Sequence, residues 1–427
     1  MIPMSTYCVA TYRLYDDKAD FTKKAQGIAI GLTVGSWTEL PELKKAAMEK
    51  HLGQVLSVDV HEPPGQLPGE SYADIRIANP DINFSADIPA LLVTLFGKLS
   101  MDGRIKLIDL KLSEPFLSRF AGPKYGIEGI RSKLMVDKRP LLMSIFKSVV
   151  GYELPELREQ FLAQALGGVD LIKDDEILFE NPLTPIGKRV EACMSAAKEA
   201  EAQTGQKLLY AVNLTGKTSQ LAKTAKEAID AGANALLFNV LAYGFDALQE
   251  LAEDSAIQVP IAAHPALAGA MYPSPHHGLS AAVLLGKLMR IAGADLVLFP
   301  SPYGSVVMPK AENMAIKAAL VTTDLASTYI HHASGDGVAT AMKLRASFPV
   351  PSAGIHPGLV PLILQDFGTD VVVNAGGGVH GHPSGAAAGG QAFRQAIDAS
   401  LKGIPLSEYA ANHSALAEAI QLWGAGH

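Results

Sequence analysis

The sequence has little cysteine and no excess of positive charge. Its two cysteines, Cys8 and Cys193, can form neither a disulfide framework nor a CxxC pair of metal ligands. Lysine and arginine together number 36 against 43 acidic residues, which gives a net charge of -7. This balance offers no basic surface for nucleic acid or for an anionic membrane. A small molecule or another protein chain is therefore the expected partner.

Long hydrophobic runs are also missing. Residues 1–18 contain acidic and polar residues where a secretory signal has an apolar core, and no uninterrupted apolar run reaches the length of a membrane span. We therefore expect a cytoplasmic protein that does not enter a membrane. Its 427 residues, of which 48% are hydrophobic and 19% charged, suit a globular chain with large cores and two domains.

Eight short runs rich in Val, Ile and Leu alternate with segments of helical character after residue 130. The runs occupy 141–147, 169–175, 208–215, 235–241, 258–264, 294–300, 348–354 and 370–377. The intervening segments, such as PELREQFLAQAL and KTSQLAKTAKEAIDAG, have Gly or Pro near an end, as helices between strands do. Eightfold alternation of strand and helix predicts an α/β fold with a (β/α)₈ TIM barrel over residues 131–427.

Residues 1–130 show a different pattern of mixed strands and helices. Strand-like segments such as STYCVATYRL and IKLIDLKLS enclose helical stretches such as DIPALLVTLFGKL. We expect a small N-terminal α+β domain of the ferredoxin-like type. At the other end, AAGGQAFRQAIDAS is expected to be the last barrel helix and SEYAANHSALAEAIQLWG one amphipathic helix outside it. Segment 331–343 is expected to be a loop or a short helix.

Most of the eight runs end in polar residues or glycine. These ends are Lys147; Lys173, Asp175 and Glu176; Asn213; Asn239; His264; 352–354; and 376–378. Barrel enzymes carry their chemistry at the carboxyl ends of the strands, so the set predicts an active site there. Ordinary loop polarity explains any one member, but it explains the whole set poorly.

The stretch GGVDLIKDDE at 167–176 places Lys173 between an apolar run and three acids. Side chains two apart on a strand face the same side, so Lys173 and Asp175 point the same way and Glu176 can turn towards them. An unmodified ammonium has no lone pair, and the cluster is then a solvated salt bridge. A lysine that has reacted with carbon dioxide becomes an anionic carbamate, and the cluster then offers oxygen ligands to Mg²⁺. The residues alone leave both interpretations open.

This stretch resembles the activation motif of the RuBisCO superfamily, and further motifs extend the similarity over essentially the whole chain. They are GLTVGSW (31–37), FGKLS (96–100), RPLLMSIFK (139–147), SAGIHPG (352–358) and NAGGGVHGHP (374–383). The resemblance implies that carbon dioxide carbamylates Lys173, which then holds one Mg²⁺ per subunit with Asp175 and Glu176. The motifs resemble the enolase branch, which acts in methionine salvage, more closely than the carboxylases.

Several groups that the family's carboxylases need are replaced in this chain. Val149 stands at the position of their second lysine, Pro265 at that of an arginine and Pro302 at about that of a histidine. Gly31 replaces an acid of the N-terminal domain, and Lys310 is out of step with the lysine of their mobile loop. The resemblance therefore implies enolisation without carboxylation.

The resemblance also implies one phosphate site instead of two. The superfamily holds one phosphate with backbone amides of the last two loops, which here contain Ser352, Gly354, Gly376 and Gly377. GSW at 35–37 is expected to help. Glycine lets N–H groups approach an anion, although a GGG run alone is more often a tight turn. The second phosphate is held by the arginine and histidine that Pro265 and Pro302 replace, so we expect a monophosphate with an uncharged far end.

The base for enolisation is implied to be Lys98, the lysine in FGKLS. In the enolase branch this lysine comes from the N-terminal domain of a neighbouring subunit, so the resemblance implies a homodimer with active sites at the subunit interface. A base must be a neutral amine, which nearby magnesium and Lys147 would favour. Lys147 and His264 are implied to contact the substrate. Without the resemblance, Lys98 is a surface residue at a helix end.

Two alternatives stay open. A RuBisCO-like isomerase of 5-methylthioribulose 1-phosphate is disfavoured by Lys98 in FGKLS. A non-catalytic RuBisCO-like protein that binds or regulates is disfavoured by the intact lysines and acids at 147, 173, 175 and 176. The histidines at 276–277, 331–332, 380 and 382 are expected to be structural.

Overall fold

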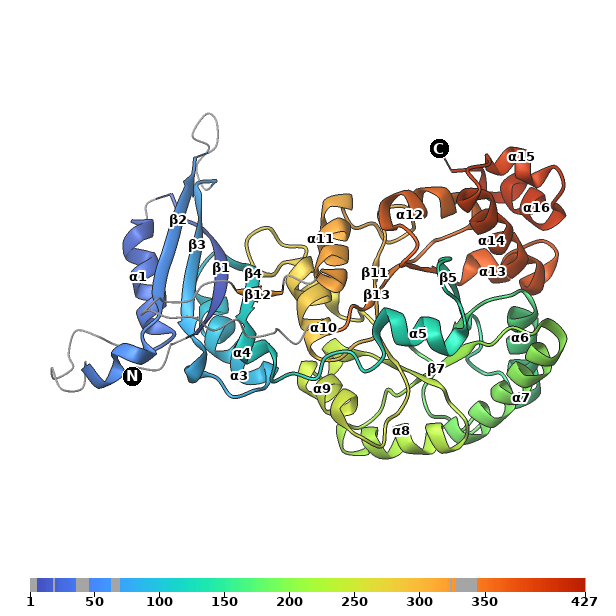
Figure 1. The fold of residues 1–427 in the computed structure, drawn as a ribbon, viewed down its shortest axis with the longest axis horizontal. Helices are drawn as coiled ribbons and strands as arrows, with labels where there is room; N and C mark the ends of the chain where they lie inside the picture. Colours follow the sequence, from blue (N-terminus) through green and yellow to red (C-terminus); the bar gives the residue numbers. More distant parts are fainter. Residues whose placement is uncertain are drawn as a thin grey trace. The chain divides into compact units, whose positions relative to one another are not determined.

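The computed structural model describes residues 6–17, 20–35, 46–62, 70–322, 325–327 and 344–426. The chain forms two compact units, both drawn in Figure 1. The first comprises Met1–Ala121, Leu267–Ala292 and Thr322–Leu344, and the second comprises Gly122–Ala266, Gly293–Val321 and Arg345–His427. The segment 331–343, expected to be a loop or a short helix, lies outside the described residues.

The first unit is built on an antiparallel sheet with four long strands. They are β1 (Tyr7–Tyr15), β2 (Gln54–His61), β3 (Tyr72–Pro80) and β4 (Ile105–Ser113), in the order β4-β1-β3-β2. β1 pairs with β3 along its whole length, from Tyr7 opposite Pro80 to Tyr15 opposite Tyr72. The helices include α1 (Phe21–Gly31), α3 (Ile88–Leu92), α4 (Glu114–Leu117) and α10 (Leu288–Ile291). This is the expected α+β arrangement.

Two later segments of the chain complete the first unit. β10 (Gly278–Leu279) and β12 (Ala326–Ser327) both run parallel to β4. Lys287 Nζ donates to Asp109 Oδ1 over 2.5 Å and to Leu110 O over 2.8 Å. These contacts attach the later segments to the sheet, so the unit draws on three stretches of the chain, whereas the sequence suggested residues 1–130 alone.

The second unit contains the eight predicted strands, all of them parallel. They are β5 (Leu141–Ile145), β6 (Leu171–Lys173), β7 (Leu209–Asn213), β8 (Ala235–Phe238), β9 (Ile261–Ala263), β11 (Leu296–Pro300), β13 (Phe348–Ser352) and β14 (Val372–Ala375). Their order is β13-β11-β9-β8-β7-β6-β5-β14. Asn374 Nδ2 on β14 donates to Ser352 Oγ on β13 over 2.9 Å, which links the two ends of this order. The predicted TIM barrel is confirmed.

Alternate residues of the strands fill the barrel interior. One buried apolar cluster includes Leu171, Leu209, Ala211, Ala262, Val350 and Val372. Residues two apart on a strand face the same side, so the inward register continues toward the carboxyl ends. The next inward positions are Lys173, Asn213, His264, Ser352 and Asn374. The interior therefore changes from apolar to polar at one end of the barrel.

Helices surround the strands of the second unit (Figure 1). They include α5 (Gly126–Leu134), α6 (Leu154–Leu166), α7 (Ile186–Thr204), α8 (Leu221–Asp230), α9 (Phe245–Glu253), α11 (Lys310–Val321), α12 (Val360–Phe367), α13 (Gly377–His380) and α14 (Gly385–Leu401). α6 begins with a capping box, because Glu153 N donates to Glu156 Oε2 over 2.8 Å. Within the described residues, no helix combines the length and apolarity needed to cross a membrane.

The prediction of one continuous helix near the carboxyl terminus is wrong. The chain forms α15 (Leu406–Ala410) and α16 (Ser414–Trp423), separated by a turn. His413 has φ of -137° and ψ of 88°, which is not helical, and its Nδ1 lies 2.6 Å from Tyr409 O. α16 then packs Ala415 and Ala419 against Ala392 of α14. The break lets the last helix, α16, pack closely on α14.

Candidate active site

A cavity of about 270 Å³ lies at the carboxyl ends of the barrel strands. It is lined by eight residues that the sequence predicts to belong to the site: Lys147, Lys173, Glu176, His264, Ser352, Gly354, Gly376 and Gly377. Asp175 is held beside them by an ion pair with Lys147. The remaining lining residues are Ile145, Pro265, Leu298, Ser305, Ala353 and Asn374. Parallel strands thus bring together residues that are far apart in the sequence, such as Lys147 and Gly377, which are 230 positions apart.

Lys173 ends β6 and is almost completely buried, with 1% of its surface exposed. Its Nζ donates to Asp174 O over 3.0 Å and lies 3.6 Å from Glu176 Oε2. Burial lowers the pKa of Lys173 and Lys147 lowers it further, against the opposite effect of the neighbouring carboxylates. A lowered pKa increases the fraction of neutral amine, the form that reacts with carbon dioxide.

Glu176 and Asp175 are each held by a cationic side chain. Lys147 Nζ donates to Asp175 Oδ2 over 2.6 Å. Glu176 Oε2 lies 3.6 Å from Lys173 Nζ and 3.6 Å from His264 Nε2. Burial opposes ionisation of Glu176, but Lys173, Lys147 and hydrogen bonds to the carboxylate together lower its pKa. Glu176 is therefore an anion at neutral pH.

These residues fit magnesium provided that Lys173 is modified. In the part of the chain that the structure describes, no three His, Cys, Asp or Glu side chains converge to hold a metal ion. Asp175 and Glu176 supply two carboxylates, and the third side chain is Lys173, whose ammonium has no lone pair. A carbamate would convert this donor into an oxygen ligand, and Mg²⁺ prefers oxygen ligands. The buried amine of lowered pKa suits that conversion.

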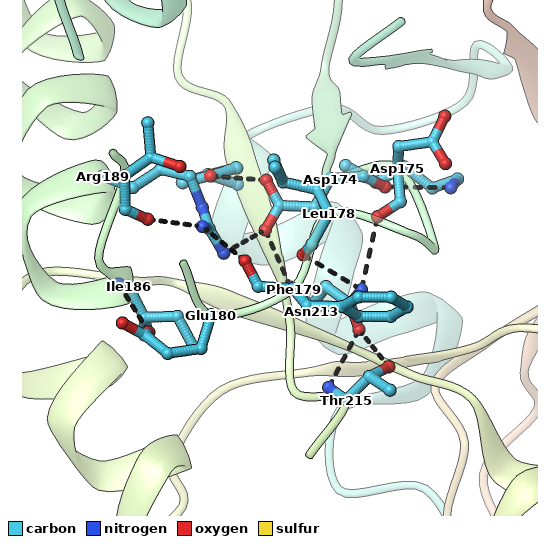
Figure 2. Close-up of polar contacts among 12 residues, drawn as sticks. Asp174, Asp175, Leu178, Phe179, Glu180, Ile186, Arg189, Asn213 and Thr215 are labelled. Carbon is cyan, nitrogen blue, oxygen red and sulfur yellow. Dashed lines mark hydrogen bonds and ion pairs between the residues drawn. The ribbon is translucent and has the colours of Figure 1, made fainter. Parts of the chain in front are cut away.

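A buried network holds the segment that follows β6 (Figure 2). Asp174 Oδ2 accepts from Arg189 Nη2 over 3.2 Å and from Asn213 N over 2.9 Å. Asp174 Oδ1 accepts from Tyr210 Oη over 2.6 Å. Burial disfavours the charge of Arg189, yet Asp174 and Tyr210 act against burial and the pKa of Arg189 is raised. The guanidinium on α7 therefore anchors the residue between Lys173 and Asp175.

The side-chain amide of Asn213, at the end of β7, holds the same segment at its backbone (Figure 2). Its Nδ2 donates to the carbonyls of Asp175, Glu176 and Leu178 over 3.3, 3.0 and 3.3 Å. Its Oδ1 accepts from Thr215 N over 3.0 Å and from Thr215 Oγ1 over 2.6 Å. One amide thus fixes the backbone on both sides of Glu176. From the sequence, Asn213 is recognisable as a polar strand end but not in this role.

His264 follows β9 and presents a neutral ring to the cavity. Burial, and after it the charge of Lys173, lowers the pKa of His264 to about 3. Its Nδ1 accepts from Ala266 N over 3.3 Å. With Nδ1 used as an acceptor, the single proton of the neutral ring lies on Nε2. His264 can therefore donate one hydrogen bond to an oxygen in the cavity.

The loops that follow β11, β13 and β14 approach one another very closely. A Cβ on Gly304 would lie 1.6 Å from Ala353 O, and one on Gly354 would lie 2.4 Å from a backbone nitrogen of the Gly304 loop. Ala353 and Gly354 also have φ of 72° and 69°, in the left-handed region. A Cβ on Gly376 would lie 3.0 Å from Lys147 Cε. Glycine thus brings backbone to the cavity wall, as an anion site made of N–H groups requires.

Lys98 belongs to the first unit, whereas the other predicted site residues belong to the second. It follows the π-helical turn Val93–Gly97, and its side chain is exposed. It lines a cavity of about 710 Å³ together with Lys23, Lys24 and eight other residues. Its role in the site of a neighbouring subunit stays a prediction. Ser36 and Trp37 of GSW lie outside the described residues.

Comparison with known proteins identifies the family. The model of the ribulose bisphosphate carboxylase large chain, catalytic domain, matches residues 126–423. The chain belongs to the RuBisCO large-chain family. Within this family, the 2,3-diketo-5-methylthiopentyl-1-phosphate enolase of Geobacillus thermodenitrificans is 53% identical over 99% of both chains. The enolase of the same name from Bacillus licheniformis is 52% identical over 97% of this chain and 98% of its own.

Solved structures of the RuBisCO family share the fold over the full length. The RuBisCO-like protein MtnW of Alicyclobacillus acidocaldarius is 45% identical, with a TM-score of 0.87 over 99% of this chain and 100% of that one. An octameric RuBisCO of Pyrococcus horikoshii is 28% identical, with a TM-score of 0.86 over 99% of this chain and 95% of that one. The relatives named as enolases are therefore much closer in sequence than this carboxylase.

Pro265 and Val149 stand at positions where the resemblance implies a departure from the carboxylases, and both carry uncharged side chains. Pro265 lines the cavity wall, and Val149 is buried with 2% of its surface exposed. Lys310, near the position of the mobile-loop lysine, pairs with Asp366 Oδ1 over 2.6 Å on α12. Tyr303 Oη contacts the same carboxylate. These contacts keep Lys310 out of the set of residues that line the cavity.

Three of the histidines that were expected to be structural make hydrogen-bonding or packing contacts. His380 Nε2 lies 2.8 Å from Ile145 O, and His382 Nε2 lies 2.8 Å from Ala415 O. His276 packs edge-on against Tyr15 with ring centroids 4.5 Å apart. The pair at 331–332 lies outside the described residues.

Four cavity residues were missed from the sequence as members of the site: Ile145, Leu298, Ser305 and Asn374. Asn374 follows Val372 in the inward register of β14, so the alternation of that strand could have revealed it. Leu298 belongs to the same register of β11, but an apolar residue there carries no signal of function. Ser305 lies in the loop after β11, where its sequence neighbours give no periodic pattern.

Proposed function

We propose that this chain converts 2,3-diketo-5-methylthiopentyl 1-phosphate into 2-hydroxy-3-keto-5-methylthiopentenyl 1-phosphate in methionine salvage. It is then an isomerase that catalyses keto–enol tautomerisation and does not carboxylate. The observation that carries the proposal is one cavity that combines the buried amine of Lys173, the carboxylate of Glu176 and two glycine-rich loops. Relatives that are 52–53% identical over nearly the whole chain bear the name of this enolase.

In this proposal Lys173, as its carbamate, holds one Mg²⁺ together with Asp175 and Glu176. Bound magnesium supplies Lewis-acid stabilisation of the negative charge that develops on the substrate oxygen. The lowered pKa of Lys173 supports the carbamate, because carbon dioxide reacts with a neutral amine. The hydrogen bonds from Asn213 to this segment support the metal site, since they keep the two carboxylates in place before any ligand binds.

The two ends of the substrate suit two walls of the cavity. We place the phosphate against Ser352, Gly354, Gly376 and Gly377, where glycine lets backbone N–H groups come close to an anion in the cavity. The methylthio end is uncharged and suits the apolar side chains of Ile145, Pro265 and Leu298. A second phosphate would find a proline where carboxylases have an arginine. Lys147 and His264 lie between these walls as donors to substrate oxygens.

The proton transfer is assigned to Lys98 of the partner subunit. Its neutral amine takes a proton from C1, the electrons of the C1–H bond form the C1=C2 double bond, and the C2 oxygen gains a proton to become a hydroxyl. The neutral ring of His264 donates from Nε2 to a substrate oxygen and takes no proton itself, in keeping with the burial that lowers its pKa. General-base catalysis of this kind contributes roughly 10²- to 10⁴-fold.

Exposed apolar side chains support the homodimer part of this proposal. The loops after β5, β6 and β11 carry Val150, Ile177, Phe179, Leu183, Val306 and Val307, all of them large and exposed. The strands are parallel, so these loops lie at the same end of the barrel as the cavity. Apolar groups gathered at one end favour contact with another protein surface. A second copy that brings its Lys98 to the cavity would cover them.

The proposal is tested by exchange of the C1 protons with solvent. In D₂O, with magnesium and bicarbonate present, the wild-type protein is expected to replace a C1 proton of the diketo monophosphate by deuterium, which proton NMR detects. Lys173→Ala is the matched control and is expected to show none of this exchange. A parallel sample with 5-methylthioribulose 1-phosphate tests the isomerase. Consumption of that substrate without exchange in the diketone would contradict the enolase assignment.

A further inference from the structure

One buried acceptor lines the cavity without a partner. Asn374 lies at the inward position of β14, and 1% of its surface is exposed. Its Nδ2 donates to Ser352 Oγ over 2.9 Å. No described residue donates to its Oδ1. A buried amide oxygen without a hydrogen bond costs free energy, so this atom in a ligand cavity calls for a donor on the ligand.

The contacts of Ser352 decide which amide atom of Asn374 is free. Ser352 Oγ donates its single proton to Val350 O over 2.8 Å. The same oxygen can then only accept from Asn374, so the amide nitrogen faces Ser352. Rotation of the amide by half a turn would place two acceptors against each other. Oδ1 is therefore the atom left for the ligand.

Other buried acceptors without partners do not line this cavity. Ser144 Oγ and Asn239 Oδ1 also find no donor among the described residues, but neither residue belongs to the cavity wall. Asn374 both lines the cavity and has a side-chain oxygen to which no described residue donates. Its side chain also touches Ser352, which lies in the proposed phosphate wall. The free acceptor is thus placed beside the end of the ligand that carries the phosphate.

We propose that Asn374 Oδ1 accepts a hydrogen bond from the hydroxyl group that enolisation creates at C2. This inference rests on the proposed function. The diketone carries only carbonyl oxygens on its carbon chain, and these accept hydrogen bonds but do not donate them. The reaction breaks the C1–H bond, forms the C1=C2 double bond and places a proton on the C2 oxygen. C2 is separated from the phosphate oxygen by C1 alone, which suits an acceptor held by Ser352.

Asn374 then distinguishes the enol from the diketone. Opposite a carbonyl oxygen, Oδ1 gains no hydrogen bond, whereas opposite a hydroxyl it gains one. The C2 oxygen carries this proton only in the enol, so the hydrogen bond stabilises the bound enol relative to the bound diketone. Asn374 is thus a substrate-contacting residue that is selective for the protonated C2 oxygen.

The test compares two stable monophosphates that differ at C2. One is 2-hydroxypentyl phosphate, an alcohol, and the other is 2-oxopentyl phosphate, a ketone. Calorimetry with the protein in magnesium and bicarbonate is expected to show a preference of the wild type for the alcohol of roughly 3- to 10-fold, the contribution of one hydrogen bond. Asn374→Leu, which keeps the branched shape of the side chain without its oxygen, is expected to lose this preference and to bind the ketone as the wild type does.

Three further variants make the result specific. Ser144→Ala removes a buried unpaired oxygen outside the cavity and is expected to keep the preference. Ser352→Ala removes the oxygen that accepts from Asn374 Nδ2 and so lets the amide turn, which is expected to reduce the preference. Asn374→Ala replaces Asn374→Leu if the leucine does not fold, and is expected to lose the preference as well. Circular dichroism checks the fold of each variant.

Several results would overturn the assignment of Asn374. They are an unchanged preference in Asn374→Leu or Asn374→Ala, equal binding of the two monophosphates by the wild type, or no binding of either. The enolase function is judged separately, by exchange of the C1 protons of the diketone in the wild type. Absence of that exchange, with a preference that depends on Asn374, would refute the enolase and leave the hydroxyl contact standing.

Discussion

Replacing Arg189 by methionine removes the guanidinium that anchors the metal-binding segment. Both side chains of the Arg189–Asp174 pair are completely buried, and they lie 3.2 Å apart. Without Arg189, Asp174 keeps its hydrogen bonds from Tyr210 Oη and Asn213 N but loses its counter-ion. Breaking a buried ion pair from one side costs about 3–5 kcal/mol, because a charge is left uncompensated. We expect Arg189→Met to lose that much free energy of unfolding.

The preceding residue supplies a matched control on the same helix. Lys188 pairs with Glu191 over 2.9 Å, but these side chains are 66% and 55% exposed. Solvent screens such a pair, so Lys188→Met is expected to cost about 0.5 kcal/mol or less. The assay is urea unfolding at pH 7 followed by far-ultraviolet circular dichroism. Both variants exchange a cationic side chain for methionine, and they differ mainly in burial.

A double variant separates the lost charge from the lost packing. Asp174→Asn combined with Arg189→Met leaves no buried charge without a partner, so it is expected to be more stable than the sum of the two single losses predicts. Equal losses for Arg189→Met and Lys188→Met would refute the reasoning, as would single losses that simply add. Weaker magnesium binding by Arg189→Met than by Lys188→Met is expected from the same cause.

Three further predictions concern the reaction. Uptake of carbon dioxide by Lys173, measured as carbamate mass, is expected to rise with pH. The pH of half-maximal uptake is expected to lie below the pH range in which an ordinary lysine loses its proton, because burial lowers the pKa of Lys173. Full activity in bicarbonate-free buffer without a carbamate would contradict this. Lys98→Ala is expected to slow enolisation by roughly 10²- to 10⁴-fold with little change in magnesium binding, and mixing it with Lys173→Ala is expected to restore activity in hybrid dimers; no recovery after proven subunit exchange would make Lys147 the next candidate for the base. Ribulose 1,5-bisphosphate is expected to give no 3-phosphoglycerate above the Lys173→Ala level, because Val149 and Pro265 replace groups that carboxylation needs; product above that level would contradict the loss of carboxylation.

The barrel could be predicted from the sequence because its signals are local. Each strand is a short apolar run and each connection a helical segment, so the alternation appears along the chain without knowledge of the packing. The first unit was harder, since β10 and β12 have only two residues each and join β4 from far along the chain. The break at His413 was missed because the apolar pattern continues across it and the turn depends on packing against α14.

Much of the candidate site could also be predicted, because parallel strands place their carboxyl ends together. Lys173 and His264 needed only the strand assignment and the resemblance to a family. Arg189 could not be found in this way. It follows Lys188 in a helix with several charged residues, where a basic side chain is usually exposed, yet Lys188 is exposed and Arg189 is buried. Only the tertiary position of Asp174 explains that difference.

Formation of the enol tests the central claim most directly. The wild-type protein, treated with magnesium and bicarbonate, is mixed with 2,3-diketo-5-methylthiopentyl 1-phosphate while the absorbance of the enol is followed. The enolase account predicts an increase whose initial rate is proportional to protein concentration and which Lys173→Ala does not produce. No increase with the treated wild type, or an equal increase with Lys173→Ala, would contradict the account.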